Sequence, residues 1–189
     1  ARAANMLSAH YQLVITNVPY LSRWKHEEVL RDFCERYCDD GKNDLATVFV
    51  QRCVDFCSSG GTSACVTPQN WLFLTSYKEL REQLLRNLSF HAVARLGAGA
   101  FESIGGEVVN VALLVITRTS PTMNAKFANW DATTSSSIEE KLSMLQTGPF
   151  RFLTQQSQLS NADSAIGIEQ STNLPLLNKF TAVYQGLCT

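Results

Sequence analysis

The chain has 189 residues, of which 45% are hydrophobic and 17% are charged, and its formal net charge is −1. This composition supports a core of ordinary size, so one main domain is expected. The near-neutral charge gives no electrostatic case for gripping a phosphate backbone, so a DNA substrate would need a basic surface elsewhere. No run of about 18 apolar residues and no secretory leader pattern is present, which predicts a cytoplasmic protein with no membrane partner.

A strand and two helices are the first expected elements. The apolar run 11–16 predicts a strand that ends at the turn around Pro19, because proline lacks the donor that would continue a ladder. Apolar residues at helical spacing predict a helix over 27–38. A second helix is expected to begin at Asn43 or Asp44, since either side chain can cap it.

A third helix and three more strands are expected next. The serine and glycine run 58–61 should end the second helix, and Ser76 and Glu79 have the spacing of a capping box that opens a third helix through Arg86. The further strands are predicted over 62–67, 89–96 and 108–116. This order of elements is that of an α/β protein with the second half of a doubly wound, Rossmann-like sheet.

The composition changes after residue 118, where Ser, Thr, Asn and Gln become frequent and apolar periodicity weakens. Only the helix 136–146, with a capping box expected at Ser136 and Glu139, stands out there. We therefore assign residues 1–118 to the partial sheet. Residues 119–189 are assigned to a linker and the beginning of a mixed or irregular recognition or accessory module.

The turn Asn17-Val18-Pro19-Tyr20 carries the chemistry that the sequence suggests. The exocyclic nitrogen of adenine is a poor nucleophile because its lone pair is delocalised into the ring, so a site that methylates it should accept both N–H hydrogens. The Asn17 side-chain oxygen and the Val18 carbonyl suit this pair of bonds, and Pro19 stiffens the turn. Tyr20 would stack on a base flipped out of the duplex. The alternative interpretation is an ordinary strand-ending turn, because Asn and Pro favour turns for backbone reasons alone.

Four segments in a fixed order resemble a known family. They are Leu13-Val14-Ile15-Thr16-Asn17-Val18-Pro19-Tyr20-Leu21, then Lys42-Asn43-Asp44-Leu45-Ala46 with Phe49 a turn later, Thr67-Pro68-Gln69-Asn70-Trp71-Leu72, and Leu96-Gly97-Ala98-Gly99-Ala100-Phe101-Glu102. Over residues 11–118 this set resembles the C-terminal half of the catalytic domain in large bacterial adenine-specific DNA methyltransferases of the BREX phage-defence and fused restriction-modification type.

The resemblance implies S-adenosylmethionine-dependent methyl transfer to the N6 amino group of adenine in double-stranded DNA. Asn17, Val18, Pro19 and Tyr20 would form the adenine-amino site, and Asn17 would also lie beside the methyl donor. Phe101 would form the opposite wall of the flipped-base pocket, although a core phenylalanine next to tight glycine turns is an equal explanation. Val18 replaces the commoner first proline of the family, which changes little because a backbone carbonyl is the group used.

The chain departs from the family in one respect. The family places a glycine-rich strand-to-helix turn and an acidic ribose ligand before the strand that carries the motif. The residues before Asn17 cannot supply them, and Gly97-Ala98-Gly99 precedes a strand rather than a helix. We therefore expect the chain to depend on a missing N-terminal part of the same protein, to be inactive alone and to expose an apolar sheet edge.

Two other functions stay open. The same turn can hold a glutamine side-chain amide, which would make the parent a protein glutamine-N5 methyltransferase, and the missing cofactor half suits a non-catalytic DNA-binding or assembly fragment. No metal is expected, because the six cysteines lack knuckle spacing and are interpreted as reduced core thiols. Arg23, Trp24 and Lys25 are candidates for DNA contacts, although a loop with two charges is the commoner explanation.

Overall fold

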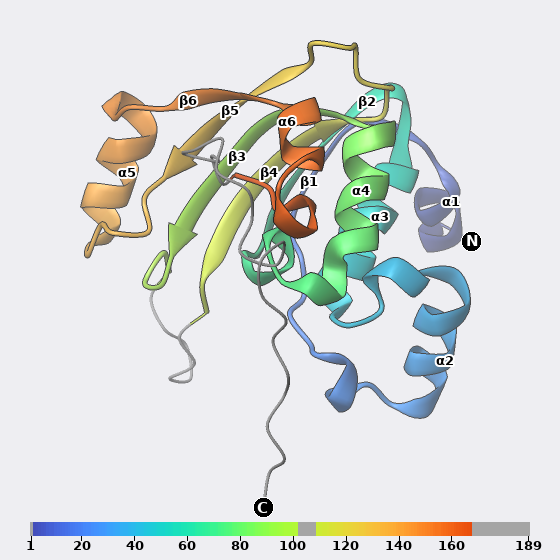
Figure 1. Cartoon of the computed structure of the whole chain (residues 1–189). Helices are drawn as coiled ribbons and strands as arrows, with labels where there is room; N and C mark the ends of the chain where they lie inside the picture. The colour runs from blue at the N-terminus through green and yellow to red at the C-terminus, as the bar shows by residue number, and fades with distance from the viewer. Residues whose placement is uncertain (1, 102–108, 168–189) are drawn as a thin grey trace, which may run out of the picture.

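The computed structural model describes residues 2–101 and 109–167, and these residues form one six-stranded sheet of order β1-β2-β4-β3-β5-β6 (Figure 1). The strands are β1 (Tyr11–Asn17), β2 (Cys57–Pro68), β3 (Ser89–Gly97), β4 (Val111–Thr117), β5 (Lys126–Asp131) and β6 (Arg151–Thr154). β1 is parallel to β2 and β3 is parallel to β5, whereas β4 is antiparallel to both β2 and β3. The carboxyl ends of β1, β2, β3 and β5 therefore share one edge of the sheet, and the predicted α/β class is confirmed.

Helices lie on both faces of the sheet, with more of them on one face than on the other (Figure 1). They are α1 (Arg2–Ser8), α2 (Glu28–Tyr37), α3 (Leu45–Phe56), α4 (Lys78–Asn87), α5 (Ile138–Thr147) and α6 (Gln155–Leu159), with the 3₁₀ turns η1 (Arg23–Lys25), η2 (Asp39–Gly41), η3 (Asn70–Leu72), η4 (Thr75–Tyr77) and η5 (Ala162–Ser164). Among the residues described, no helix has the length and apolar character that crossing a membrane requires.

The main core lies between the sheet and the helices α3 and α4. It contains Val50 of α3, Leu80 of α4, and Val93, Leu114 and Phe127 of the central strands. A smaller core on the other face joins Ala94, Leu96 and Val111 to Met144 and Leu145 of α5. Burial of these side chains at roughly 25 cal/mol per Å² is the main force that holds the layers together.

The strand β2 begins earlier than the sequence predicts. The helix α3 ends at Phe56, and the serine and glycine run 58–61 lies inside β2 rather than in a connecting turn. Gly60 has a φ of +77°, which a residue with a side chain rarely adopts. A Cβ on Gly61 would lie 2.7 Å from the carbonyl oxygen of Tyr11. These glycines therefore let β2 approach β1 closely where the register of the two paired strands shifts.

The predicted helices form, but two capping details are wrong. Of the two residues expected to cap α3, Asp44 is the one that does so, and its side chain accepts a hydrogen bond from the Ala46 nitrogen at 2.8 Å. The box expected at Ser76 is absent, because the turn η4 occupies residues 75–77 and α4 begins at Lys78 without a side-chain cap. At α5 the capping box uses Ser137 and Glu140, one residue later than expected.

The sheet continues beyond residue 118. The strands β5 and β6 extend it, and their Phe127 and Leu153 enter the main core together with Ile166. The sheet and this core therefore cross from 1–118 into the part of 119–189 that the structure describes. The linker and recognition module assigned to 119–189 stays a prediction.

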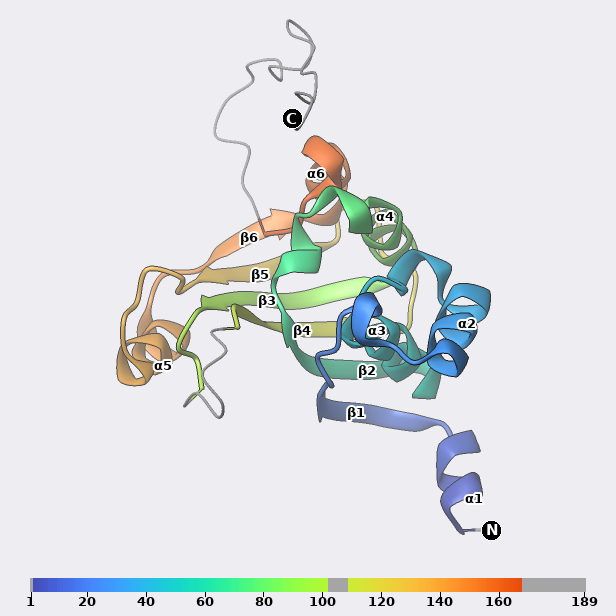
Figure 2. The ribbon, with the colours of Figure 1, turned by 90° about the horizontal axis from the view of Figure 1, so that it is seen from below.

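The strand β1 forms an outer edge of the described sheet, with no described strand beyond it (Figure 2). Val14 packs toward α3, whereas Leu13 and Ile15 are 56% and 71% exposed. The expected exposed apolar edge is thereby confirmed.

Candidate functional site

The Asn-Val-Pro-Tyr turn lies at the carboxyl end of β1, as predicted. Asn17 ends the strand and pairs in register with Val66 of β2. The next residue, Val18, is 3% exposed and donates its backbone N–H to the Val66 carbonyl at 3.2 Å. Asn17 and Pro19 are exposed, and no hydrogen bond from another described residue reaches the Asn17 side chain. The turn is thus fixed by its buried residue and presents its amide outward.

The side chain of Tyr20 is held in place by packing on its buried side. Its half-buried ring packs against the cluster of Val18, Ala46, Cys53 and Cys65. The hydroxyl group is buried and has no hydrogen-bond partner among the described residues. Burial, and to a smaller extent the carboxylate of Asp44, raises the pKa of Tyr20, so the ring stays neutral. A neutral ring with part of its surface open can stack on a planar ligand.

The chain after Tyr20 is clamped to the start of α3. Asp44 accepts a hydrogen bond from the Leu21 nitrogen at 3.3 Å, and the Leu45 nitrogen donates to the Leu21 carbonyl at 2.8 Å. The ring of His26, which is 5% exposed, lies 2.9 Å from the same carbonyl. The segment that resembles the family at 42–46 therefore holds the motif in place, a role that the sequence reasoning missed.

The loop after β2 closes the neighbouring part of the same edge. Trp71 is 2% exposed, and its indole N–H donates to the Thr67 hydroxyl at 3.0 Å. Gln69 donates its backbone N–H to the Asn110 carbonyl at 2.8 Å, which joins this loop to the start of β4. Because β1 and β2 are parallel, this loop lies beside the motif turn.

The buried guanidinium of Arg81 fixes that loop, although the sequence reasoning did not single it out. Arg81 has no exposed surface and donates to the carbonyls of Trp71 at 2.6 Å and Leu74 at 2.7 Å. It also donates to the carbonyls of Asp163 at 2.6 Å and Ser164 at 3.2 Å. Arg81 therefore ties the loop after β2 to the turn η5, whose Asp163 lies 82 residues from Arg81 in sequence.

Phe101 lies at the same edge but not beside the motif. It follows β3 and is 52% exposed, so it is not a core phenylalanine. Since β2 and β4 separate β1 from β3, the ends of β1 and β3 lie about 14 Å apart at a strand spacing of ~4.8 Å. The described residues do not bring Phe101 into contact with the turn 17–20, and a role as the opposite wall of a base pocket stays a prediction.

A buried lysine holds the base of the loop that carries Phe101. Lys141 is 3% exposed and donates to the carbonyls of Leu96 at 2.7 Å, Ala132 at 3.1 Å and Ser135 at 2.6 Å. Its sequence signal is its spacing, because it lies three and four residues before apolar positions of α5 and so falls on the apolar face of that helix. The same signal was present for Arg81 in α4.

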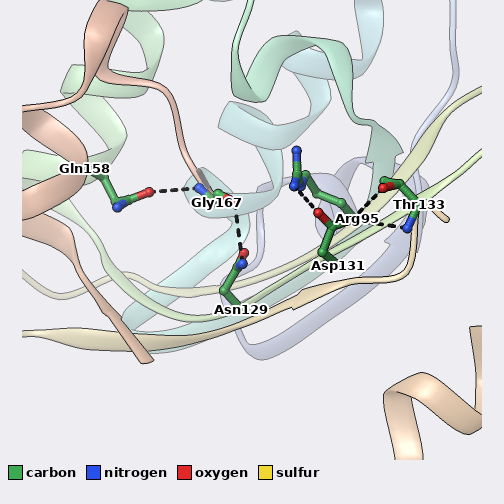
Figure 3. Close-up of polar contacts among 6 residues, drawn as sticks. All are labelled: Arg95, Asn129, Asp131, Thr133, Gln158 and Gly167. Carbon is green, nitrogen blue, oxygen red and sulfur yellow. Dashed lines mark hydrogen bonds and ion pairs between the residues drawn. The ribbon is translucent and has the colours of Figure 1, made fainter. Parts of the chain in front are cut away.

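A cavity of about 380 Å³ opens near the carboxyl ends of β3 and β5. Arg95 forms an ion pair with Asp131, which also accepts hydrogen bonds from the Thr133 hydroxyl at 2.6 Å and backbone N–H at 3.1 Å (Figure 3). Burial alone would raise the pKa of Asp131, but the bonds from Thr133 and the charge of Arg95 outweigh it and lower that pKa. This carboxylate therefore stays ionised and joins two strand ends.

Polar groups at and beside this cavity also hold the fold together. The Gln158 side-chain oxygen accepts a hydrogen bond from the Gly167 nitrogen at 2.9 Å, and the Asn129 amide reaches the Gly167 carbonyl at 3.5 Å (Figure 3). Within the described residues, no group of three or more His, Cys, Asp or Glu side chains is arranged to hold a metal ion, and the five cysteines are free thiols.

The described residues do not fit a complete pocket for S-adenosylmethionine. Gly97 and Gly99 have φ values of +67° and +69°, but the next described element after them is a strand, β4. A Cβ on Gly97 would lie 3.1 Å from the Thr133 Cα, so this glycine serves close packing. Among the described helices, none opens directly from a glycine-rich turn behind a strand, which is the arrangement that cradles such ligands.

Known proteins resemble the chain over its first part. A family model described as Eco57I restriction-modification methylase matches residues 3–101, just over half of the chain. Adenine-specific methyltransferase PglX of Lacticaseibacillus casei (strain Zhang) is 36% identical over 115 residues, which are 61% of this chain and 10% of that protein. Adenine-specific methyltransferase BrxX of Escherichia coli O9:H4 (strain HS) is 38% identical over 111 residues, which are 59% of this chain and 9% of that protein. The chain thus spans about a tenth of the length of these curated relatives.

Solved structures share the fold. The ATP-dependent type ISP restriction-modification enzyme LlaBIII, solved bound to DNA, superposes with a TM-score of 0.65 at 16% identity, over 91% of this chain and 13% of that one. An identity this low supports the fold alone, which agrees with the predicted partial Rossmann-like sheet.

Proposed function

Because the chain belongs to the Eco57I restriction-modification methylase family, we propose that it forms the base-binding half of an adenine-N6 DNA methyltransferase. The methyl donor is S-adenosylmethionine, and an upstream part of the same protein cradles it, since the described residues contribute little beyond Asn17. The isolated chain is inactive on this proposal, and the activity is that of the parent protein.

The observation that carries the proposal is the exposed amide of Asn17 beside the Val18 carbonyl. Neither group receives a hydrogen bond from another described residue, while the Val18 nitrogen is fixed to Val66. Two acceptors in a rigid turn at the carboxyl edge of an open α/β sheet match the two N–H hydrogens of an amino group. Accepting both hydrogens directs the nitrogen lone pair toward the methyl donor and lowers the barrier to its attack.

Two aromatic residues complete the proposed base pocket. Tyr20 stacks on the flipped adenine, because it is neutral, held by packing of its ring and partly open. Phe101 covers the base from the loop after β3, which shares the edge with β1. The net charge of −1 gives this part little pull on phosphates, so most of the grip on DNA belongs to the rest of the parent.

The proposal is tested by transfer of labelled methyl groups to unmethylated DNA by the parent protein. Asn17→Ala should lower the turnover about 100- to 1,000-fold, the usual effect of losing one polar group that acts in the transition state. DNA affinity and thermal stability should change little, because the amide is exposed. The matched control is Asn87→Ala, which removes another exposed amide at the far end of α4.

The outcome also separates the alternatives. Label in N6-methyladenine that disappears in Asn17→Ala supports the proposal, whereas full turnover by that variant removes Asn17 from the mechanism. Label on a glutamine of a protein would identify the other enzyme class. A folded parent that binds DNA and methyl donor but transfers nothing would indicate a non-catalytic role.

A further inference from the structure

Trp24 combines an open side chain with a fixed backbone. Its indole is 91% exposed in the turn η1. Burial of such a ring would release free energy in proportion to its area, so an open indole on a fixed backbone is a ready contact surface. The proposed base pocket does not include Trp24, which follows Tyr20 by four residues.

Backbone hydrogen bonds and an ion pair fix the turn that carries this indole. The Arg23 nitrogen donates to the Asn43 carbonyl at 3.0 Å, and Ser22 forms an antiparallel bridge with Asp44. The Arg23 guanidinium forms an ion pair with Glu35 of α2, and the His26 nitrogen closes the turn by donating to the Arg23 carbonyl at 3.1 Å. The indole is therefore presented by a rigid support, which reduces the entropy lost when it binds.

The turn η1 lies at the edge where the base must enter. The helix α3 belongs to the connection between the parallel neighbours β1 and β2, so it runs against them and its first residues lie at their carboxyl edge. Figure 2 shows the segment between β1 and α2 passing close to the start of α3. Since Asn43 and Asp44 hold η1 there, Trp24 shares the edge with Asn17.

We propose that Trp24 stacks on a nucleobase of the DNA beside the flipped adenine. This inference rests on the proposed function, because a duplex that delivers adenine to Asn17 must approach the same edge. Flipping one base leaves the faces of its neighbours bare, and a rigid indole can cover such a face. The contact is stacking rather than phosphate binding, because the indole carries no charge and Arg23, one of its two neighbouring cations, already pairs with Glu35.

The first test measures the affinity of the parent protein for a duplex that contains its target adenine. Trp24→Ala should weaken binding about 5- to 150-fold, the usual range for the loss of one base–aromatic stack, and Trp24→Phe should recover most of it. The slope of log affinity against log salt should not change, since no phosphate contact is lost. The control is Val29→Ala, which removes another exposed apolar group, 83% exposed, on α2 and should leave affinity unchanged.

The second test locates the contact directly. Duplexes with 5-iodouracil at each position flanking the target adenine are irradiated with the parent, and the crosslinked peptide is identified by mass spectrometry. The crosslink is expected on Trp24 and should disappear in Trp24→Ala. Unchanged affinity of Trp24→Ala without a crosslink would overturn the proposal, and so would a lowered thermal unfolding temperature of that variant at unchanged DNA affinity, because Trp24 would then pack against another part of the parent.

These results do not depend on the fate of the methylation proposal. If the parent methylates adenine and binds DNA equally well with and without Trp24, only the stacking proposal is refuted. A parent that shows the Trp24 crosslink and the affinity loss but transfers no methyl group keeps the contact and refutes the enzyme. A parent that binds no DNA refutes both.

Discussion

Tyr20 carries a hydroxyl group that is buried with no partner among the described residues. An unpaired buried hydroxyl costs free energy, roughly 1–3 kcal/mol, whereas the ring around it contributes packing and a stacking surface. The two parts of this side chain therefore have opposite effects on stability. Packing of the ring holds the side chain in place, and the ring is also the part that the proposed reaction uses.

This division predicts different results for two substitutions in the parent protein. Tyr20→Phe removes only the hydroxyl. It should leave methylation unchanged and the unfolding temperature unchanged or slightly raised. Tyr20→Ala also removes the ring and should lower kcat/KM about 5- to 150-fold, the range expected when one base stack is lost. Methyl-transfer kinetics and thermal unfolding of both variants check this. A Tyr20→Phe enzyme as weak as Tyr20→Ala would show that the hydroxyl acts in the reaction.

The sequence predicted where the motif turn lies, because Pro19 must end the strand that precedes it. It did not predict the polar groups that hold the turn. Asp44 was expected only as a cap of α3, yet it also accepts from Leu21, a residue 23 positions away. Contacts between distant segments leave no periodic signal in a single sequence, so their partners became visible only in the folded chain.

Among the elements, α4 has the most consequential side chain. The guanidinium of Arg81 donates to carbonyls in the loop after β2 and in the turn η5, and none of these acceptors is a carboxylate. A planar group with five donors in a fixed fork can serve both segments at once, whereas an ammonium group has a different reach and geometry. The joint between these elements thus depends on arginine rather than on positive charge.

Arg81→Lys should therefore destabilise the parent nearly as much as Arg81→Met, which leaves buried carbonyls unpaired at a cost of about 3 kcal/mol or more. Hydrogen–deuterium exchange should accelerate in residues 70–75 and 162–166 in both variants. Arg86→Lys is the matched control, because that arginine is largely exposed in the same helix. Wild-type protection in Arg81→Lys would contradict the fork geometry as the cause.

Elements with a strong period were predictable and the others were not. The helices α2 and α3 and the strand β1 follow their apolar patterns closely. The strand β5, Lys126–Asp131, has neither an apolar run nor a clear alternation, and it forms because β3 and β6 supply partners on both sides. Tertiary pairing of this kind overrides weak local preference.

For the whole molecule, the main feature is the open edge at β1. Nine of the large exposed apolar side chains lie within residues 6–37: Met6, Leu7, Tyr11, Leu13, Ile15, Trp24, Val29, Phe33 and Tyr37. A strand with free backbone groups and apolar side chains pairs readily with another chain. The isolated chain should therefore self-associate, and an upstream half that covers β1 should prevent this.

One added charge on β1 should affect the isolated chain and the parent protein in different ways. Ile15→Lys should make the isolated chain more monomeric, because lysine on an edge strand opposes pairing. It should also abolish methylation by the parent, because an upstream half covers this face on our proposal. Light scattering after size-exclusion chromatography and the methylation assay give the two readouts. Ile138→Lys on α5, 43% exposed, is the control and should change neither. A wild-type chain that is monomeric at high concentration would contradict the prediction.

The open edge of β1 has one more consequence. Hydrogen bonds between strands do not depend on whether the two strands belong to one polypeptide, so a second neighbour for β1, which the described sheet does not supply, can come from a separate chain. The protein could then be divided into two gene products that are silent apart and regain methylation when they meet. Such a pair would act as a complementation reporter, in which a chemical mark on the genome records that two molecules were present in the same cell.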